Sequence, residues 1–275
     1  MSDIADRLKL TDVEAPSDGL IVGRIGSVTV VLLDRPTRRN AFTSHMMAAF
    51  GPLWQRLDVD GKTRCIVFGT TSEDFFCSGI DVKQVAETGE AGADLPWGRP
   101  PHLTTKHARV FTPVVCAVEG PTVGGGMHFV LDADIVIAGD EATFFDTHTR
   151  LGFVGATETV GLTVKAGLGA ALYFGLGGTN VRISAHDAKN LGLVQEIVPK
   201  GTALTRAIEF GAFVAQGSPS ANKRTVEVAW AAADLGCEEG LRFGRSLTAR
   251  QRDHPDWKEG PRAFAEKREP RWQDT

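Results

Sequence analysis

Several features that would assign a chain to a specialised class are missing here. Only four cysteines occur in 275 residues, and their spacing fits neither a disulfide framework nor a metal site. Positive charge is not in excess, because 30 Lys and Arg face 34 Asp and Glu, which argues against a nucleic-acid partner. No apolar run approaches the roughly 18 residues of a membrane span. The charged N-terminus, MSDIADRLKL, lacks the apolar block of a signal peptide. We therefore expect a cytoplasmic protein that binds no nucleic acid, membrane or metal.

What the chain does contain is the pattern of an α/β fold. Short runs rich in Val and Ile predict strands at 27–33, 64–68, 113–118 and 134–138. Their nearly continuous hydrophobicity is typical of strands that are covered on both faces. Apolar residues at three- and four-residue steps in 42–57 predict a helix with one buried face. Largely parallel pairing, with helices between the strands, follows from this order.

The C-terminal part has a different character. From Thr202 onward the pattern is helical and contains no strand candidate. We therefore expect a core over residues 1–200 and a helical region over 201–275. Within the core, the segment 87–104 holds Gly, Pro and charge without periodicity, which predicts a loop that can cover a site.

Two glycine-containing segments follow predicted strands, at 75–81 (FFCSGID) and 120–127 (GPTVGGGM). A glycine triplet that opens a helix leaves backbone N–H groups unpaired, with the positive end of the helix dipole behind them. Two such segments can place two amides around one oxygen, which is an oxyanion hole. The same glycines also fit ordinary tight turns, because GGG is neither a GxGxxG nor a P-loop motif.

Six motifs carry a family resemblance when they are taken in order. They are LDRPTRRNAF, FFCSGIDV, EGPTVGGGMHF, DADIVIAGDEATF, ISAHDAKNLGLV and EGPRAFAEKREPRW. With them, the chain resembles the enoyl-CoA hydratase/isomerase (crotonase) superfamily over most of its length. The resemblance implies a crotonase-like spiral core of ββα repeats and a C-terminal helical trimerisation region, assembled as a homotrimer or homohexamer. It also implies an acyl-CoA thioester substrate and no cofactor, since coenzyme A enters only as part of that substrate.

The resemblance assigns roles to residues by position. Ile80 and Gly125 would supply the two oxyanion amides that hold the thioester oxygen as an enolate forms. Residues expected to meet the CoA portion are Arg39, Ser78, Phe264 and Lys267. In relatives, the matching tail residues often serve a neighbouring subunit. The cations among these residues fit a solvated basic face equally well.

Two histidines stand where hydratases of this kind have glutamates. His128 lies two residues after the glycine triplet, and His148 follows the ATF motif. Imidazole, with an ordinary pKa near 6.5, can act as acid or base at neutral pH. We expect the pair to titrate as a coupled unit and, when doubly protonated, to place two positive charges beside the thioester. Glu158 is expected to orient His148 or to act itself, although an exposed loop carboxylate is the alternative. Asp146 is expected to make a local hydrogen bond.

Three functions remain open at this point. The first is an enoyl-CoA hydratase-type lyase or isomerase, as in fatty acid metabolism. The second is a hydrolase that cleaves a C–C bond of a β-diketone or cyclic ketone by retro-Claisen chemistry, for which His45 aligns loosely. The third is a catalytically silent acyl-CoA-binding paralogue, because neither glutamate is present.

The acyl pocket is predicted to involve Trp97, Phe129 and Phe153. The other histidines receive no role: His102, His107, His186 and His254.

Overall fold

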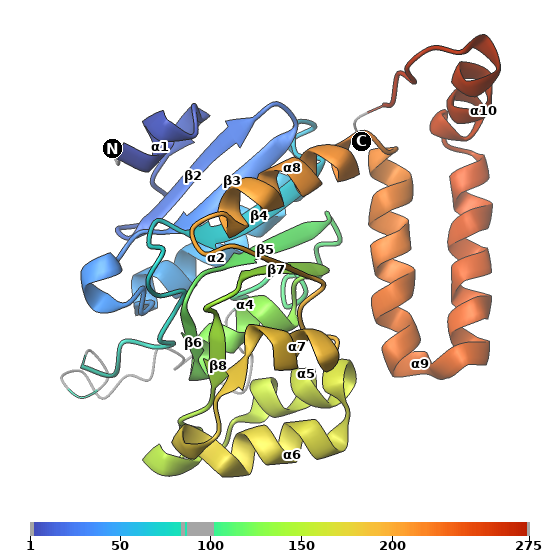
Figure 1. Cartoon of the computed structure of the whole chain (residues 1–275). Helices are drawn as coiled ribbons and strands as arrows, with labels where there is room; N and C mark the ends of the chain where they lie inside the picture. Colours follow the sequence, from blue (N-terminus) through green and yellow to red (C-terminus); the bar gives the residue numbers. More distant parts are fainter. Residues whose placement is uncertain (1–2, 84–85, 87–101, 274–275) are drawn as a thin grey trace.

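A seven-stranded sheet forms the centre of the computed structural model, which describes residues 3–83, 86 and 102–273 (Figure 1). In spatial order its strands are β1 (Thr11–Glu14), β2 (Leu20–Ile25), β3 (Val28–Leu33), β4 (Cys65–Thr70), β5 (Val114–Val118), β7 (Ile135–Gly139) and β10 (Glu196–Val198). The first three pair antiparallel, and every pair from β3 to β10 is parallel. The predicted mixed α/β class with largely parallel pairing is confirmed.

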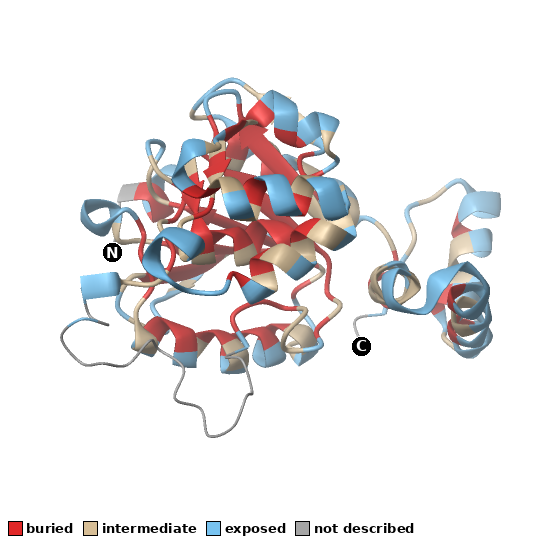
Figure 2. Ribbon diagram, turned by 90° about the horizontal axis from the view of Figure 1, so that it is seen from below, coloured by how far each residue is buried: buried red, intermediate tan, exposed pale blue. Residues whose placement is uncertain are grey.

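The central strands are buried on both faces because their side chains alternate between two cores. In β3, Val31 and Leu33 join one apolar cluster, whereas Val30 and Leu32 join the other. Helix α2 (Ser44–Val59) covers the first face, and α8 (Ala203–Ala215) covers the second. Figure 2 shows the buried residues concentrated in the sheet between these layers.

Helix α2 forms as its apolar spacing predicts. The side chain of Thr43 caps its first turn and accepts a hydrogen bond from the Met46 N–H at 3.2 Å. Its buried face stacks Phe50 on Trp54, with ring centroids 5.5 Å apart. The Trp54 indole N–H is satisfied by the Leu103 carbonyl at 3.0 Å, which joins the helix to the segment that precedes β5.

A small second sheet positions the candidate site. It consists of β6 (Pro121–Val123), β8 (Thr143–Phe145) and β9 (Ile183–Ser184), with β6 and β8 parallel. After β6 come the 3-10 turn η2 (Gly124–Gly126) and helix α4 (Met127–Leu131). After β8 come η3 (His148–Leu151) and helix α5 (Ala156–Ala166). Because the two strands are parallel, both sets of following residues start at the same edge.

The remaining short elements complete the fold around these layers. They are α1 (Asp3–Arg7), η1 (Pro36–Arg38), α6 (Leu168–Gly177), η4 (Gly178–Asn180) and α7 (Ala185–Asn190). Ser184 and Asp187 form a reciprocal capping box at the start of α7.

The C-terminal helices divide into two groups. Helix α8 lies flat on the sheet, and a Cβ at its Gly211 would meet Val67 Cγ2 at 3.1 Å, so glycine permits the close packing. Helix α9 (Pro219–Arg252) instead folds back on itself at Gly236, which has φ 72° and ψ 178°. With α10 (Asp256–Glu266) it makes an arm that projects from the core (Figures 1 and 2). In the part of the chain that the structure describes, no helix is both long and apolar enough to span a membrane.

Candidate active site

The end of β6 and the end of β8 bring the glycine triplet and the second histidine together. Val123 and Phe145 are paired in register, so Gly124 and Asp146 follow side by side. Gly124 has φ +48°, and a Cβ there would lie 3.5 Å from His148 Cε1. The positive φ favours glycine at this position, and the imidazole packs directly beside the turn.

The two predicted oxyanion amides are neighbours. A Cβ built on Gly79 would lie 2.9 Å from the Gly125 nitrogen, and one built on Gly125 would lie 3.7 Å from the Ile80 nitrogen. Ile80 forms a β-bridge with Phe42. The hydrogen bonds of this bridge run from the Phe42 N–H to the Gly79 carbonyl and from the Asp81 N–H to the Phe42 carbonyl. The Ile80 N–H therefore points to the side of the chain that faces away from Phe42. Gly125 is in the first turn of η2, where N–H groups have no partner within the helix. The arrangement allows both amides to serve one ligand oxygen.

A carboxylate lies between the two histidines. Glu158 Oε1 is 2.6 Å from His128 Nε2 and 3.7 Å from His148 Nε2. A second carboxylate supports the other side of His148, because Asp146 Oδ1 lies 2.6 Å from its Nδ1. Both acids are buried, with Glu158 only 4% and Asp146 only 2% exposed. The four side chains thus form one chain of contacts, which we call the His–acid cluster: His128, Glu158, His148 and Asp146.

Each member of the His–acid cluster is held by a different element. His128 is the second residue of α4, and Glu158 lies in the first turn of α5, where the helix dipole favours a carboxylate. His148 begins η3, two residues after the loop residue Asp146. Helices α4 and α5 pack closely at Gly161, where a Cβ would meet Leu131 at 3.0 Å.

The charges of the His–acid cluster stabilise one another. Burial raises the pKa of Glu158, but the hydrogen bond from His128 and the charges of both histidines outweigh burial, so this pKa lies below its usual value. Asp146 shows the same balance, with His148 lowering its pKa. The bond to Asp146 raises the pKa of His148 against the opposing effect of burial. Glu158 and Asp146 are therefore ionised, and His148 keeps its proton to higher pH than free imidazole does.

This charge balance corrects one expectation. Doubly protonated histidines would not place two uncompensated positive charges beside a substrate, because the buried Glu158 and Asp146 neutralise them. The interpretation of Glu158 as an exposed loop carboxylate is wrong as well, since it is buried on a helix. Asp146 makes the local hydrogen bond that was predicted for it.

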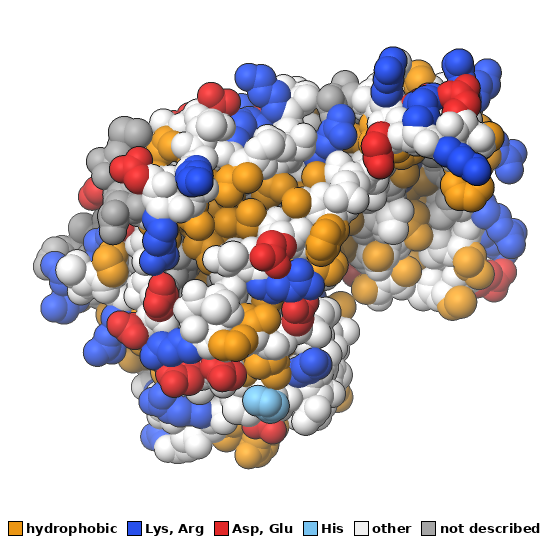
Figure 3. All heavy atoms as spheres, turned by 45° about the horizontal axis from the view of Figure 1, so that its top comes forward, with side chains coloured by type: hydrophobic (Ala, Val, Ile, Leu, Met, Phe, Trp, Pro, Cys, Tyr) orange, Lys and Arg blue, Asp and Glu red, His pale blue; other side chains and the backbone are white. Residues whose placement is uncertain are grey.

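The residues predicted to meet CoA fall into two places. The Ser78 N–H donates to the Arg39 carbonyl at 3.0 Å, so these two lie together beside the Ile80 loop. Phe264, which is 88% exposed, and Lys267 are on or next to α10, and the arm holds them away from the His–acid cluster of the same chain (Figure 1). Figure 3 shows Lys and Arg side chains gathered on that arm.

The two predicted acyl-pocket residues that the structure describes, Phe129 and Phe153, differ in burial. Phe129 is 4% exposed and stacks on Phe68 with ring centroids 4.3 Å apart, so it belongs to the core. Phe153 is 54% exposed. Trp97 lies outside the described residues. Most of the predicted covering loop, residues 87–101, lies outside them as well. His45 is exposed on α2.

One histidine beside the His–acid cluster has no signal in the sequence. The His107 ring lies edge-on to His128, with ring centroids 6.0 Å apart. The residue is in an irregular segment between 102 and 113, where no periodicity predicts the direction of a side chain. Only the packing of this segment against α4 brings the two rings together.

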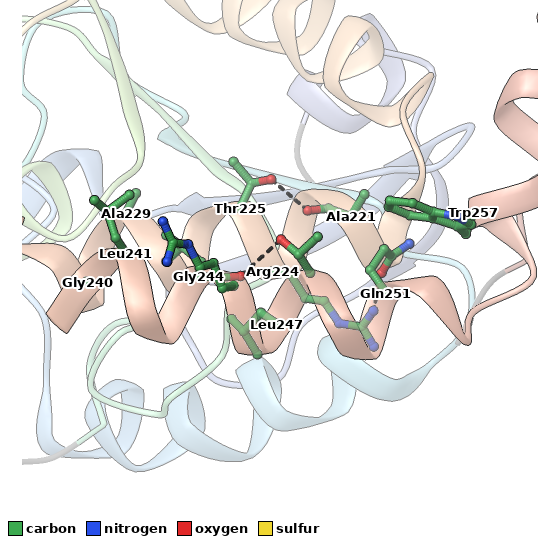
Figure 4. Close-up of a pocket in the computed structure, with 13 residues that line it drawn as sticks. Ala221, Arg224, Thr225, Ala229, Gly240, Leu241, Gly244, Leu247, Gln251 and Trp257 are labelled. Carbon is green, nitrogen blue, oxygen red and sulfur yellow. Dashed lines mark hydrogen bonds between the residues drawn. The ribbon is translucent and has the colours of Figure 1, made fainter. Parts of the chain in front are cut away.

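Two cavities are lined by residues of helix α9. A cavity of about 590 Å³ between α5 and α9 is lined by His107, Asp132 and Thr157, among others. Its lining includes none of the four residues of the His–acid cluster, although the His107 ring contacts His128. A second, of about 550 Å³, lies between the two halves of α9 and beside Trp257 (Figure 4). Its lining includes Leu241 and Leu247 but no histidine or acid, which makes it unsuitable for acid–base chemistry.

Comparison with known proteins was made for sequence and for structure. A family model described as "Enoyl-CoA hydratase/isomerase" matches residues 23–275. Enoyl-CoA hydratase EchA19 of Mycobacterium tuberculosis is 30% identical over 272 residues, covering 96% of this chain and 100% of the relative. Carnitinyl-CoA dehydratase of Proteus mirabilis is 33% identical over 253 residues, covering 90% and 95%. A crystal structure of an enoyl-CoA hydratase/isomerase from Mycobacterium paratuberculosis superposes with a TM-score of 0.84 at 31% identity, covering 94% of this chain and 99% of that one.

Proposed function

The chain belongs to the enoyl-CoA hydratase/isomerase (crotonase) family, and on that premise we propose that it is an acyl-CoA enzyme of the hydratase type. It would add water across the α,β double bond of an enoyl thioester. The observation that carries this proposal is the buried Glu158 carboxylate between two imidazoles, one of which, His148, lies beside the glycine turn that contains Gly125.

The amides of Ile80 and Gly125 are the proposed oxyanion hole. Attack of water on the β-carbon pushes electrons onto the thioester oxygen, and two preorganised N–H donors stabilise the enolate that results. Removing one such donor typically costs about 2.7–4 kcal/mol of transition-state stabilisation. Because backbone groups donate, the isoleucine side chain at position 80 does not conflict with this role.

The His–acid cluster supplies the two proton transfers. Ionised Glu158, bonded to His128, accepts a proton from the attacking water. His148, which holds its proton because of Asp146, donates that proton to the α-carbon as the enolate collapses. The proton on Glu158 then returns to His148 Nε2, 3.7 Å from Glu158 Oε1. The cycle adds one water to the substrate and restores every group.

We further propose how the CoA portion is held and how the chain assembles. Arg39 and Ser78 lie beside the Ile80 loop, which suits contact with the near part of CoA. Phe264 and Lys267 sit on the projecting arm, which suits contact with the CoA of a neighbouring subunit in a homotrimer or homohexamer.

Crotonyl-CoA tests the proposed function. Loss of the conjugated thioester absorbance should be catalysed by the native protein and should slow by about 10²–10⁴-fold in His148→Ala, the usual contribution of a positioned acid. The matched control is His186→Ala, since His186 is exposed on α7. Failure of the native protein to hydrate short, long and aromatic enoyl-CoAs would contradict the proposal.

One observation keeps the retro-Claisen hydrolase as a second candidate. A histidine oriented by a buried aspartate, as His148 is by Asp146, also suits activation of water for attack on a ketone. Cleavage of a cyclic β-diketone, together with no binding of acetyl-CoA by calorimetry, would favour that reaction. A catalytically silent paralogue would bind CoA, and the replacement of both His128 and His148 would leave every measured rate unchanged.

A further inference from the structure

Helix α5 contacts α4 along one face, and this face extends beyond the His–acid cluster. Glu158 lies 2.6 Å from His128, and a Cβ at Gly161 would meet Leu131 at 3.0 Å. Lys165, in the last turn of α5, follows at the spacing that places it on the same face of the helix. The face that holds the catalytic carboxylate at one end therefore carries a lysine at the other.

The ammonium group of Lys165 joins the end of α5 to the end of α4. Its Nζ atom donates to the Val130 carbonyl at 3.3 Å and to the Ala133 carbonyl at 2.7 Å. Val130 belongs to the last turn of α4, where carbonyl groups have no partner within the helix, and Ala133 follows that turn. Because α4 has only five residues, it is too short to be stable alone and depends on contacts with its neighbours.

This lysine is held at a cost in stability. Its Nζ atom lies 5.4 Å from the ring centroid of Trp230 in α9, and burial lowers the pKa of Lys165 to about 8. Desolvating a cation costs free energy, so an apolar side chain would serve better if stability alone mattered. The other groups that act on this pKa are Asp134, Asp132 and Cys116, which raise it, and Lys106, which lowers it.

We propose that Lys165 is a positioning residue that fixes α4 against α5 and so holds His128 in place on Glu158. The imidazole and the carboxylate belong to different helices, so the 2.6 Å contact between them depends on how these helices are placed relative to each other. This inference rests on the proposed hydratase function for its kinetic consequence, but not for the contact itself.

Kinetics with crotonyl-CoA test the consequence in Lys165→Met. Methionine fills a similar space but donates no hydrogen bond, so α4 loses this attachment. We expect kcat to fall by about 10-fold to 10²-fold, as for a displacement of about 1 Å at reacting groups. Lys106→Met is the matched control and should leave kcat unchanged. The Lys106 Nζ atom also lies 5.4 Å from the Trp230 ring, but it pairs with Asp134 at 3.0 Å.

The pH profile of kcat/KM separates positioning from a simple effect of charge. The charged forms of His128 and His148 lower the pKa of Glu158, which also interacts with His107. A loosened bond from His128 raises this pKa, so the acid limb should move to higher pH in Lys165→Met. Loss of a positive charge would move the limb in the same direction.

Lys165→Gln distinguishes these two causes, because it removes the charge but keeps N–H donors for the carbonyls. Its kcat and its acid limb should lie closer to those of the native protein than to those of Lys165→Met. Equal changes in Lys165→Gln and Lys165→Met would show that charge alone acts and would overturn the inference.

A ¹³C NMR titration of the glutamate carboxyl groups needs no turnover. The Glu158 signal is identified by its loss in Glu158→Gln. Its midpoint should lie below the usual glutamate range in the native protein and in Lys106→Met, and higher in Lys165→Met. The same midpoint in the native protein and Lys165→Met, or an equal rise in Lys106→Met, would contradict the proposed role. Absence of crotonyl-CoA turnover by the native protein would instead count against the proposed function, with the NMR titration still deciding this inference.

Discussion

At the scale of single residues, the His–acid cluster reverses the arrangement expected from two glutamates that hold a water molecule. Here a buried carboxylate is held by two imidazoles, and His148 is supported by a further acid. Carboxylates that accept hydrogen bonds from imidazoles stay ionised, and the carboxylate beside His148 favours the protonated form of that ring. Asp146 is consequently the residue that most directly determines how His148 titrates.

Asp146→Asn should therefore move the alkaline limb of kcat/KM to lower pH. The carboxylate raises the pKa of His148, so its neutral isostere lets the ring lose its proton earlier, and the protonated donor becomes scarcer at neutral pH. A pH profile from 5 to 10 with crotonyl-CoA measures the shift. The control is Glu141→Gln, which removes an exposed carboxylate paired with Lys200. An unchanged limb in Asp146→Asn would show that His148 is not the acid.

At the scale of elements, the site depends on turns rather than on long helices or strands. Strands β6 and β8 have three residues each, too few for a periodicity that can be recognised in the sequence. Their parallel pairing nevertheless sets the glycine triplet beside His148. The longer β3, β4, β5 and β7 were predictable because burial on both faces demands continuous Val and Ile.

Gly79→Ala tests the oxyanion hole at this scale. Gly79 has φ +87°, and a Cβ would reach within 2.9 Å of the Gly125 nitrogen, so kcat should fall by about 10²–10³-fold. Gly61→Ala is the control, because Gly61 also has a positive φ of +65° but has no atom within 4 Å of its Cβ position. This variant carries a similar backbone strain of about 1–2 kcal/mol, and its new methyl group does not approach the proposed amides. Urea unfolding and crotonyl-CoA kinetics separate the two effects. Equal kcat in both variants would argue against the proposed amides.

At the scale of the whole molecule, the chain is a core with a projecting arm. Helix α8 completes the second face of the sheet, while α9 and α10 carry exposed apolar side chains such as Leu241, Trp257 and Phe264 into solvent. Trp230 ties the first half of α9 to the core, because its indole N–H donates to Asp134 at 2.7 Å. Apolar surface on an arm of this kind is typical of association between subunits.

The native chain of 29.5 kDa should therefore sediment as a trimer or hexamer, and Leu241→Arg should shift it toward monomer. Leu241 lines the apolar cavity of the arm and is 57% exposed, so a charge there opposes burial against another subunit. Val59→Arg makes the same change at an exposed site on α2 and should leave the mass unaltered. Light scattering after size exclusion measures both. A monomeric native chain would contradict the prediction.

The amino-acid sequence by itself determined the buried strands, helix α2, the family and the two candidate histidines, because each of these leaves a local pattern of burial or a recognisable motif. Only the tertiary structure decided that Glu158 lies between the rings, that Asp146 supports His148 and that His107 contacts His128. These contacts depend on the register of two short strands and on the packing of α4, α5 and the 102–113 segment. These contacts join residues that are far apart in the chain, so they cannot be predicted from short-range periodicity in the sequence.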